Sequence, residues 1–249
     1  MTARVSFDFT GTSVLLTGGT SGIGHATALL FRDAGADVTV TGTRPGAAEY
    51  DTDLTGMRYA RLRLDDPTAV DEFAAEFRRL DVLVNNAGAN FPGGLDESAP
   101  DGFEASVALN LTAPYRLTVG LHAALRASTA TGGASVVNLS SMSALRAVTM
   151  VPGYGSAKAG IISMTRNLAV KWSQDNIRVN AIAPGAIETP MTAPMMSFPE
   201  IRDPELAHIP IGRFGLVGEV APTIAFLCTE QSSYTSGALF VIDGASDCY

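Results

Sequence analysis

The chain has 249 residues, 46% of them hydrophobic and 17% charged, which is typical of a globular protein the size of one large α/β domain. Its net charge of −8 argues against a nucleic-acid partner or an anionic membrane surface, because neither attracts an acidic protein. Two cysteines and three scattered histidines give no metal-ligand spacing, and the chain has no signal-peptide core or membrane-spanning run, so we expect a cytoplasmic protein without a metal.

Short β-branched runs alternate with helical patterns along the chain. The runs are mostly apolar throughout, as expected for a parallel sheet that is covered on both faces. Strands are predicted at 14–17, 37–41, 59–64, 81–85, 134–139, 177–182 and 238–242. Helices are predicted at 25–34, 69–79, 101–127, 154–172 and 217–229. This alternation predicts a single doubly wound, Rossmann-like α/β domain over residues 1–249, with a seven-stranded parallel sheet.

The first predicted strand runs into a glycine-rich turn, Thr17-Gly-Gly-Thr-Ser-Gly-Ile-Gly24, and a helical pattern starts directly after it. Glycine lets the backbone approach a pyrophosphate, and a helix N-terminus offers free N–H groups with a partial positive charge. The turn predicts a dinucleotide site, although an ordinary glycine-rich connection explains the same pattern. The cofactor contacts expected here are Gly18, Thr20, Ser21, Gly22, Ile23 and Gly24.

The end of the second predicted strand bears on the choice of cofactor. In folds of this kind an acidic residue there bonds the ribose diol of NAD, whereas this chain has Gly42, followed by Thr43 and Arg44. No carboxylate repels a 2′-phosphate at that place, and Arg44 can pair with the phosphate. The sequence therefore favours NADP(H). NAD is the alternative, in which Arg44 is only a solvated loop cation.

Tyr154 and Lys158 are four residues apart in a predicted helix, so their side chains share one face. An ammonium group beside a phenol favours the phenolate and lowers its pKa, which suits a general acid/base; a helix-surface pair is the alternative. Ser141 follows a central strand at the edge where substrates bind, and its hydroxyl can bond a carbonyl oxygen; it is otherwise a turn serine. Asn110, in an apolar helical stretch, is either a buried amide or a site residue.

Five motifs, in this order, resemble those of the short-chain dehydrogenase/reductase family: Thr17-Gly-x-x-x-Gly-x-Gly24, Asn85-Asn-Ala-Gly88, Ser141, Tyr154-x-x-x-Lys158 and Pro184-Gly185. The resemblance covers the whole chain. It implies a Rossmann-like domain that transfers a hydride reversibly between a nicotinamide dinucleotide and a carbonyl/alcohol pair, a small-molecule substrate. It also implies that Tyr154 is the general acid/base, that Ser141 holds the substrate oxygen, that Lys158 lowers the Tyr154 pKa and binds the nicotinamide ribose, and that Asn110 anchors a proton-relay water.

The same resemblance implies further cofactor contacts, at Leu64, Asn86, Ala87, Gly88, Pro184, Gly185, Ile187 and Thr189. Relatives usually carry an adenine-contacting aspartate where this chain has Arg63. The chain is similar to 3-oxoacyl-thioester reductases and to ketone or sugar-alcohol dehydrogenases about equally. A homotetramer is implied as well, and the broad apolar character of the helical stretches at 102–127 and 154–172 supports it.

The segment 188–214, rich in proline and methionine, is the least regular part of the sequence. It follows the sixth predicted strand, at the edge where ligands bind, and it is expected to form a substrate lid. Its apolar side chains suit an apolar substrate, or else pack the lid against the core. The alternative function is a non-catalytic redox sensor that binds a dinucleotide on the same fold. Such a protein is expected to lose Tyr154, Lys158 or Ser141, and this chain retains all three.

Overall fold

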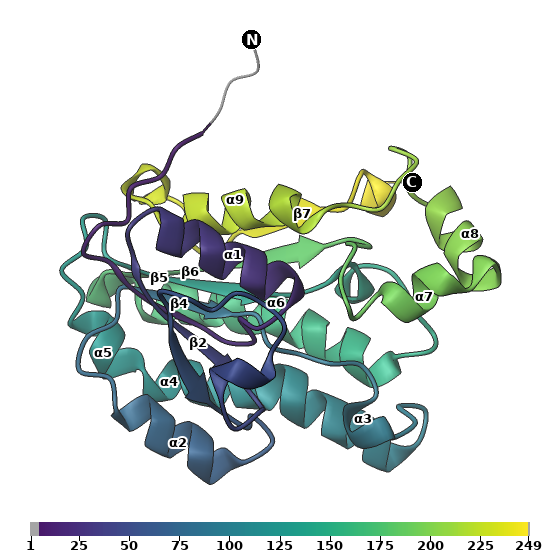
Figure 1. Ribbon diagram of the computed structural model, residues 1–249, viewed down its shortest axis with the longest axis horizontal. Helices are drawn as coiled ribbons and strands as arrows, with labels where there is room; N and C mark the ends of the chain where they lie inside the picture. The colour runs from purple at the N-terminus through teal and green to yellow at the C-terminus, as the bar shows by residue number, and fades with distance from the viewer. Residues whose placement is uncertain (1–4, 249) are drawn as a thin grey trace.

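Seven parallel strands form the central sheet of the computed structural model, which describes residues 5–248 (Figure 1). They are β1 (Ser13–Leu16), β2 (Asp37–Gly42), β3 (Arg58–Arg61), β4 (Val82–Asn85), β5 (Ala134–Leu139), β6 (Ile177–Pro184) and β7 (Leu239–Ile242). Their order across the sheet is β3-β2-β1-β4-β5-β6-β7. The predicted Rossmann-like fold and seven-stranded parallel sheet are confirmed; residues 1–4 and 249 of the predicted domain lie outside the described part.

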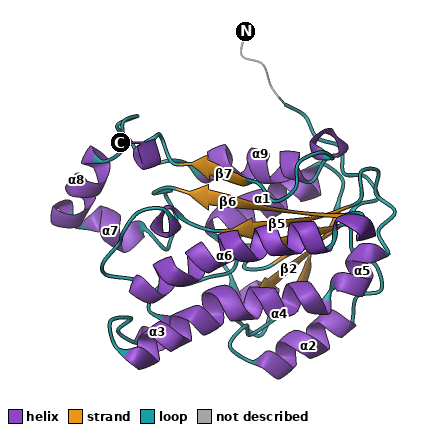
Figure 2. Ribbon diagram, turned by 180° about the vertical axis from the view of Figure 1, so that it is seen from behind, coloured by secondary structure: helices purple, strands orange, loops and turns teal. Residues whose placement is uncertain are grey.

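Helices cover both faces of the sheet (Figure 2). They are α1 (Gly22–Asp33), α2 (Pro67–Ala75), α3 (Pro100–Val107), α4 (Ala113–Gly120), α5 (His122–Arg126), α6 (Pro152–Lys171), α7 (Ala193–Ser197), α8 (Pro199–Ala207) and α9 (Val217–Leu227). Helices α1 and α9 lie together on one face, and α2, α4, α5 and α6 lie on the other. None of these helices is long and apolar enough to cross a membrane.

Strand β1 shows why the sheet is apolar on both sides. Successive side chains of a strand point to opposite faces. Val14 and Leu16 pack in the same cluster as Phe31 of α1, whereas Leu15 packs with Phe73 of α2. Each of these five side chains is buried. Both faces therefore contribute to the hydrophobic core, which accounts for the continuous apolar runs in the sequence.

The path of the chain creates a crevice next to β1. From β1 the chain moves outward to β2 and β3, and then returns to place β4 against the other side of β1. Connections that leave two neighbouring strands in opposite directions open a crevice at their carboxyl ends, which is where ligands bind in such sheets. The glycine turn after β1 and Asn86, which follows β4, meet at this place.

Several predicted boundaries were wrong, for local reasons. Helix α1 begins at Gly22, inside the glycine motif, and not at His25. The helix predicted over 101–127 is divided into α3, a five-residue π-helix at Ala108–Thr112, α4 and α5. The backbone stays helical through this junction, and Pro114, which has no N–H to donate to the helical ladder, directly follows the π-helical turn.

The segment 188–214 is more regular than expected, because it contains α7 and α8. Both helices have proline in the first turn, and α8 contains Pro204 as well. Proline fits the first helical turn but is a helix breaker elsewhere, so the sequence suggested a loop. Both helices are short, and none of their residues is buried. The lid role expected for this segment stays a prediction.

Candidate active site

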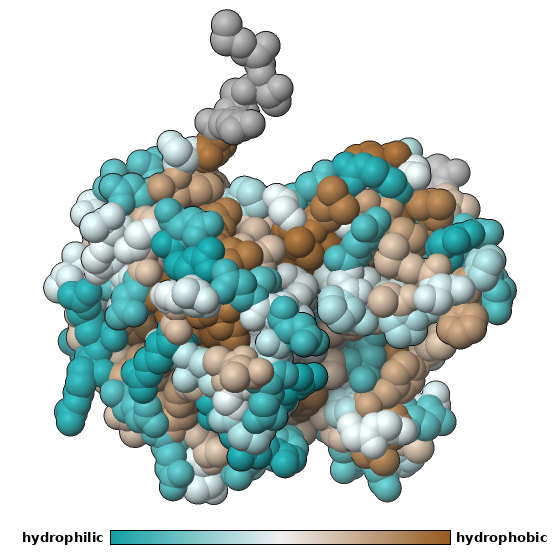
Figure 3. Space-filling view, in the orientation of Figure 1, coloured by the Kyte–Doolittle hydropathy of each residue, from teal (hydrophilic) through white to brown (hydrophobic). Residues whose placement is uncertain are grey.

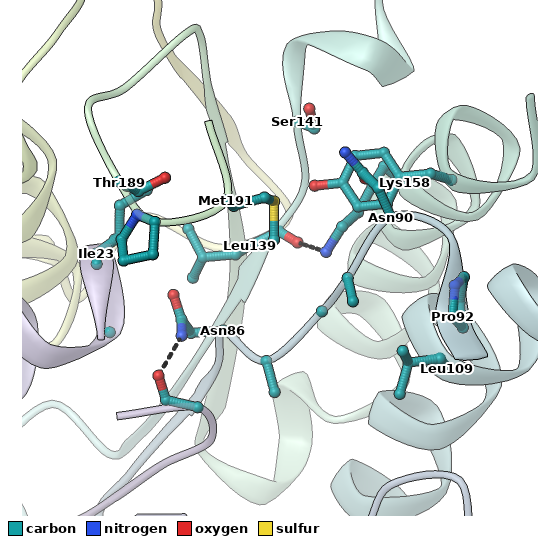
Figure 4. A pocket seen from close by; sticks show the side chains of 18 of the residues that line it. Ile23, Asn86, Asn90, Pro92, Leu109, Leu139, Ser141, Lys158, Thr189 and Met191 are labelled. Atoms are coloured by element: carbon teal, nitrogen blue, oxygen red, sulfur yellow. Dashed lines mark hydrogen bonds between the residues drawn. The ribbon is translucent and has the colours of Figure 1, made fainter. Parts of the chain in front are cut away.

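A cleft of about 1000 Å³ opens at the carboxyl edge of the sheet (Figure 4). The surface is indented between the segment that carries α7 and α8 and the segment that carries α3 (Figure 3). Every predicted site residue lines the cleft except Asn110 and Arg44. We call the part near Gly42, Tyr50 and Leu64 the adenosine end, and the part near Met142 and Met195 the substrate end.

The glycine turn forms a close-packed cradle. Gly18 has a φ of +67°, which side chains rarely adopt, and a Cβ on Gly24 would overlap the Gly18 carbonyl oxygen and the Asn86 amide. The Asn86 amide nitrogen donates to the carbonyl oxygens of Thr17, at 3.0 Å, and Gly18, at 3.1 Å. This side chain therefore ties the turn after β1 to the end of β4, as the dashed line in Figure 4 shows for one of its bonds.

The N-terminus of α1 fits a phosphate group. Ser21 is the N-cap residue but makes no side-chain capping bond, and the first turn contains no acidic residue. The first backbone bond of the helix runs from His25 N–H to the Ser21 carbonyl oxygen, at 3.0 Å. The N–H groups of Gly22, Ile23 and Gly24 are therefore the donors that an α-helix leaves for an external acceptor.

At the adenosine end the wall is formed by Tyr50, which the sequence did not single out. Tyr50 lines the cleft, and its hydroxyl accepts from the Arg44 backbone N–H at 2.9 Å. The Arg44 guanidinium lies outside the cleft, 4.8 Å from the centre of the Tyr50 ring, and donates to the Glu49 carbonyl oxygen. A Cβ on Gly42 would overlap the Tyr50 hydroxyl. No turn or motif in the sequence indicates that Tyr50 packs against Gly42.

Arg63, which stands where relatives usually carry an adenine-contacting aspartate, also lines this end. Its Nη2 atom donates to the carboxylate of Asp65 at 2.6 Å, and both side chains are more than half exposed. The Arg63 charge is therefore neutralised locally, beside a carboxylate that lines the cleft too.

Three predicted catalytic groups meet in the middle of the cleft. Ser141 follows β5, and Tyr154 and Lys158 lie on α6. The Lys158 ammonium donates to the Leu139 carbonyl oxygen at 2.7 Å (Figure 4). It lies 5.4 Å from the centre of the Tyr154 ring. The Ser141 hydroxyl accepts from the Ser143 backbone N–H at 3.1 Å and lines the cleft together with Tyr154. Two hydroxyl groups and one cation thus converge at one place.

Burial controls the protonation of this group. It raises the pKa of Tyr154 to about 12; the neighbouring Ser141 hydroxyl opposes that rise, and the charge of Glu97 adds to it. It lowers the pKa of Lys158 to about 8. We expected Lys158 to lower the pKa of Tyr154, but the pKa of Tyr154 is raised, and burial is the main cause. At neutral pH the Tyr154 phenol is therefore protonated, and Lys158 is protonated in most molecules.

Glu97, a second residue not singled out by the sequence, supports the position of Tyr154. It is buried, with one carboxylate oxygen accepting from the Tyr154 backbone N–H at 2.7 Å and the other from the Phe91 N–H at 2.9 Å. These bonds connect the first turn of α6 to the loop after β4. A lone glutamate in a loop gives no sequence signal of such a role.

Asn110 lies behind the wall of the cleft, in the π-helical turn. It is fully buried: its side chain exchanges hydrogen bonds with the backbone of Ala89, at 3.1 and 2.9 Å, and donates to the Ser106 carbonyl oxygen at 3.0 Å. A Cβ on Gly88 would lie 2.7 Å from its Oδ1 atom and 3.4 Å from the Lys158 ammonium. Asn110 thus fixes the loop after β4 beside Lys158, and its water-relay role stays a prediction.

The substrate end combines apolar and charged side chains that no motif announced. They are Met142, Arg146, Val148, Val151, Met191, Met195 and Glu205. Arg146 lies five residues after Ser141, and Glu205 lies in the segment expected to form a lid. Within residues 5–248 no cluster of His, Cys, Asp or Glu has the composition of a metal site.

Comparisons with known proteins agree with this geometry. The enoyl-(acyl carrier protein) reductase family model matches residues 18–245. Cis-4-hydroxycyclohexanecarboxylate dehydrogenase of Sinomonas cyclohexanicum is 37% identical over 239 residues, covering 92% of this chain and 94% of the relative. The 3-oxoacyl-[acyl-carrier-protein] reductase FabG of Thermotoga maritima is 34% identical over 245 residues, covering 92% and 95%. Pseudomonas aeruginosa RhlG, solved as a complex with NADP, superposes with a TM-score of 0.85 at 29% identity, covering 98% of this chain and 100% of that one. The chain therefore belongs to the short-chain dehydrogenase/reductase family of NAD(P)-dependent oxidoreductases.

Proposed function

We propose that the protein is an NADP(H)-dependent oxidoreductase that interconverts a carbonyl group and a secondary alcohol on a small-molecule substrate. The observation that carries this proposal is the convergence of Ser141, Tyr154 and Lys158 in the same cleft as the glycine cradle. The alternatives, a turn serine and a helix-surface Tyr–Lys pair, do not explain why these three side chains lie beside the glycine cradle.

The residues present fit a dinucleotide along the cleft. Its pyrophosphate would accept from the free N–H groups of the first turn of α1, and Pro184 and Thr189 would line the nicotinamide. A Cβ on Gly22 would lie 3.3 Å from Thr189, so this threonine packs directly against the cradle. When bound, the cofactor supplies or accepts the hydride.

The three central side chains would handle the substrate oxygen and its proton. The hydroxyls of Ser141 and Tyr154 hold the carbonyl oxygen, and Tyr154 gives its proton to that oxygen as negative charge develops there. The raised pKa keeps the phenol protonated until then. The nearby Lys158 ammonium stabilises the phenolate that remains, and it eases removal of the alcohol proton in the reverse direction.

Two features of the adenosine end favour NADP(H) over NAD(H): it has no carboxylate at Gly42, and Arg44 lies nearby. Gly42 provides no carboxylate to bond a ribose diol or to repel a phosphate. The Arg44 guanidinium lies just outside the cleft, 4.8 Å from the centre of the Tyr50 ring that lines it. The NADP complex of the similar RhlG supports this preference.

The substrate end suits a compact, largely apolar body, because valine and methionine side chains line it. The relative that acts on a hydroxycyclohexanecarboxylate supports cyclic ketones and alcohols as the first compounds to examine. The test is a panel of cyclic and linear carbonyls and alcohols, assayed with NADPH and NADH by cofactor absorbance, with Tyr154→Phe as the matched inactive control. Turnover by the wild type alone supports the proposal. Tight NADPH binding without turnover of any compound supports the redox-sensor alternative.

We also propose a homotetramer. Tyr115 and Val119 of α4 and Val170 of α6 are exposed, apolar and on the helical stretches whose broad apolar character suggested an interface. Light scattering at micromolar concentration tests this, and a monomer there would contradict it. The cytoplasmic location expected from the sequence stays a prediction.

A further inference from the structure

An ion pair spans the substrate end of the cleft. The Arg146 Nη2 atom donates to a carboxylate oxygen of Glu205, and its second contact is the Met142 sulfur, at 3.5 Å. The two charged side chains are only 24% and 19% exposed. They come from different elements, because Arg146 follows the Ser141 loop and Glu205 lies on α8.

This ion pair differs from its surroundings, because the rest of the substrate end is uncharged. Among the described residues, the other charged side chains that line the cleft are Lys158 at the catalytic centre and the Arg63–Asp65 pair at the adenosine end. The other residues that line the substrate end are uncharged, among them Met142, Val148 and Val151. Charges in such a place need a reason, because burying them costs free energy that one ion pair rarely repays.

The guanidinium is also incompletely used. Its Nε atom is buried and has no hydrogen-bond partner among the described residues. Glu205 therefore accepts from Nη2 but not from the adjacent Nε of the same guanidinium. A carboxylate placed against both atoms would make a bidentate pair, which is the stronger and more specific arrangement. An unpaired buried donor is costly, so a ligand that satisfies it gains affinity.

Glu205 is placed on an element that can move aside. None of the residues of α8 is buried, and the small hydrophobic cluster beneath the segment, Ala186, Ile209 and Phe214, uses Leu206 as its contact on α8. A helix with so little buried surface is held weakly, so exchanging the Glu205 carboxylate for another requires little other disruption.

We propose that Arg146 is a specificity residue that binds a carboxylate on the substrate, and that Glu205 occupies this place until the substrate displaces it. The substrate class is then a keto acid or hydroxy acid whose apolar body separates the reacting carbon from the carboxylate. This inference rests on the proposed function, since Ser141 and Tyr154 define where the reacting oxygen lies. A purely structural latch between α8 and the Ser141 loop is the competing explanation.

The first test measures binding without turnover. Cyclohexanecarboxylate and cyclohexanecarboxamide have the same shape but differ in charge, and neither has a carbonyl that the enzyme can reduce. Calorimetry on the NADP⁺-loaded protein is expected to show the acid binding at least about tenfold more tightly than the amide, as a charge-assisted pair requires. Arg146→Met should remove that preference, whereas Glu205→Gln should strengthen acid binding. Equal binding of acid and amide, no measurable binding of the acid, or a preference that survives Arg146→Met would overturn the proposal.

The second test separates this proposal from the general activity. The substrates are 4-oxocyclohexanecarboxylate and its methyl ester. We expect the wild type to prefer the acid through a lower KM, Arg146→Met to lose this preference because the KM of the acid rises far more than that of the ester, and Glu205→Gln to lower the KM of the acid. If the pair is only a latch, both variants change acid and ester rates alike, and the carboxylate site is refuted while reductase activity stands. Tight acid binding without turnover of either compound would instead contradict the proposed reaction. NADPH affinity, measured for each variant, reports on folding.

Discussion

The catalytic centre and the adenosine end of the cleft are built differently, although one ligand is expected to span them. At the catalytic centre, Tyr154 and Lys158 are held by a twenty-residue helix, and Lys158 is buried. At the adenosine end, Arg44 and Tyr50 belong to a connection that contains only a three-residue 3₁₀ turn, Ala47–Glu49. A residue in a long helix keeps its spacing in space, whereas a residue in a loop is placed by contacts that the sequence does not encode locally.

The largest expected effect tests the catalytic centre. Tyr154→Phe removes one hydroxyl and should lower kcat by about 10²–10⁴-fold, the usual contribution of a general acid/base. NADPH affinity should stay unchanged, because the aromatic ring that packs in the cleft remains. Rates from cofactor absorbance and affinity from NADPH fluorescence measure the two quantities. A variant that keeps more than about a tenth of the wild-type rate would show that Tyr154 is not the acid.

The second prediction is that replacing Lys158 lowers activity but raises stability. Burial lowers its pKa from 10.5 to about 8, so the unfolded chain binds this proton more tightly than the folded protein does. The resulting destabilisation is fully present below pH 8 and disappears as the pH rises from 8 to 10.5. Lys158→Met should therefore raise the free energy of unfolding by about 2 kcal/mol at neutral pH, after allowance for the lost bond to the Leu139 carbonyl, while abolishing most turnover.

Thermal unfolding of both proteins at neutral pH and near pH 10 checks this, with calorimetry as the readout. The Tm difference should shrink at the higher pH. A variant that is less stable than the wild type at neutral pH would mean that the Lys158 hydrogen bond outweighs its burial cost. Arg166→Met, at another α6 position whose residue does not line the cleft, is the matched control and should show no such pH dependence.

The same contrast explains what the sequence predicted well and what it did not. Spacing within helices and at strand ends placed Ser141, Tyr154, Lys158 and Gly24 in one cleft, because each is carried by a regular element or adjoins one. Long-range contacts of loops were not accessible from spacing. Tyr50 returns against Gly42 from eight residues away, and Glu205 reaches Arg146 across 59 residues. Short helices that begin with proline were likewise read as loop.

The third prediction concerns Gly42. A carboxylate at this position should favour NADH by bonding the ribose diol and repelling a 2′-phosphate. The structure adds a condition, because any side chain here overlaps the Tyr50 hydroxyl. Gly42→Asp alone should therefore weaken both cofactors, whereas Gly42→Asp combined with Tyr50→Ala should prefer NADH. The kcat/KM values for both cofactors decide this, with Tyr50→Ala as the control. A single Gly42→Asp variant that reverses the preference without losing NADH efficiency would show that Tyr50 is not an obstacle.

The smallest expected effect is at Arg44. The sequence suggests a charge-assisted pair between Arg44 and a 2′-phosphate, but this side chain is exposed and lies against the outside of Tyr50. An exposed charge pair contributes about 0.2–1 kcal/mol, so Arg44→Ala should weaken NADPH by no more than about fivefold and leave NADH unchanged. The difference should vanish at high salt, because exposed charges are screened. Dissociation constants for both cofactors at low and high salt measure it. A tenfold loss that persists in salt would show that Arg44 leaves the Tyr50 ring and enters the cleft when NADPH binds, and equal weakening of both cofactors would withdraw its role in choosing between them.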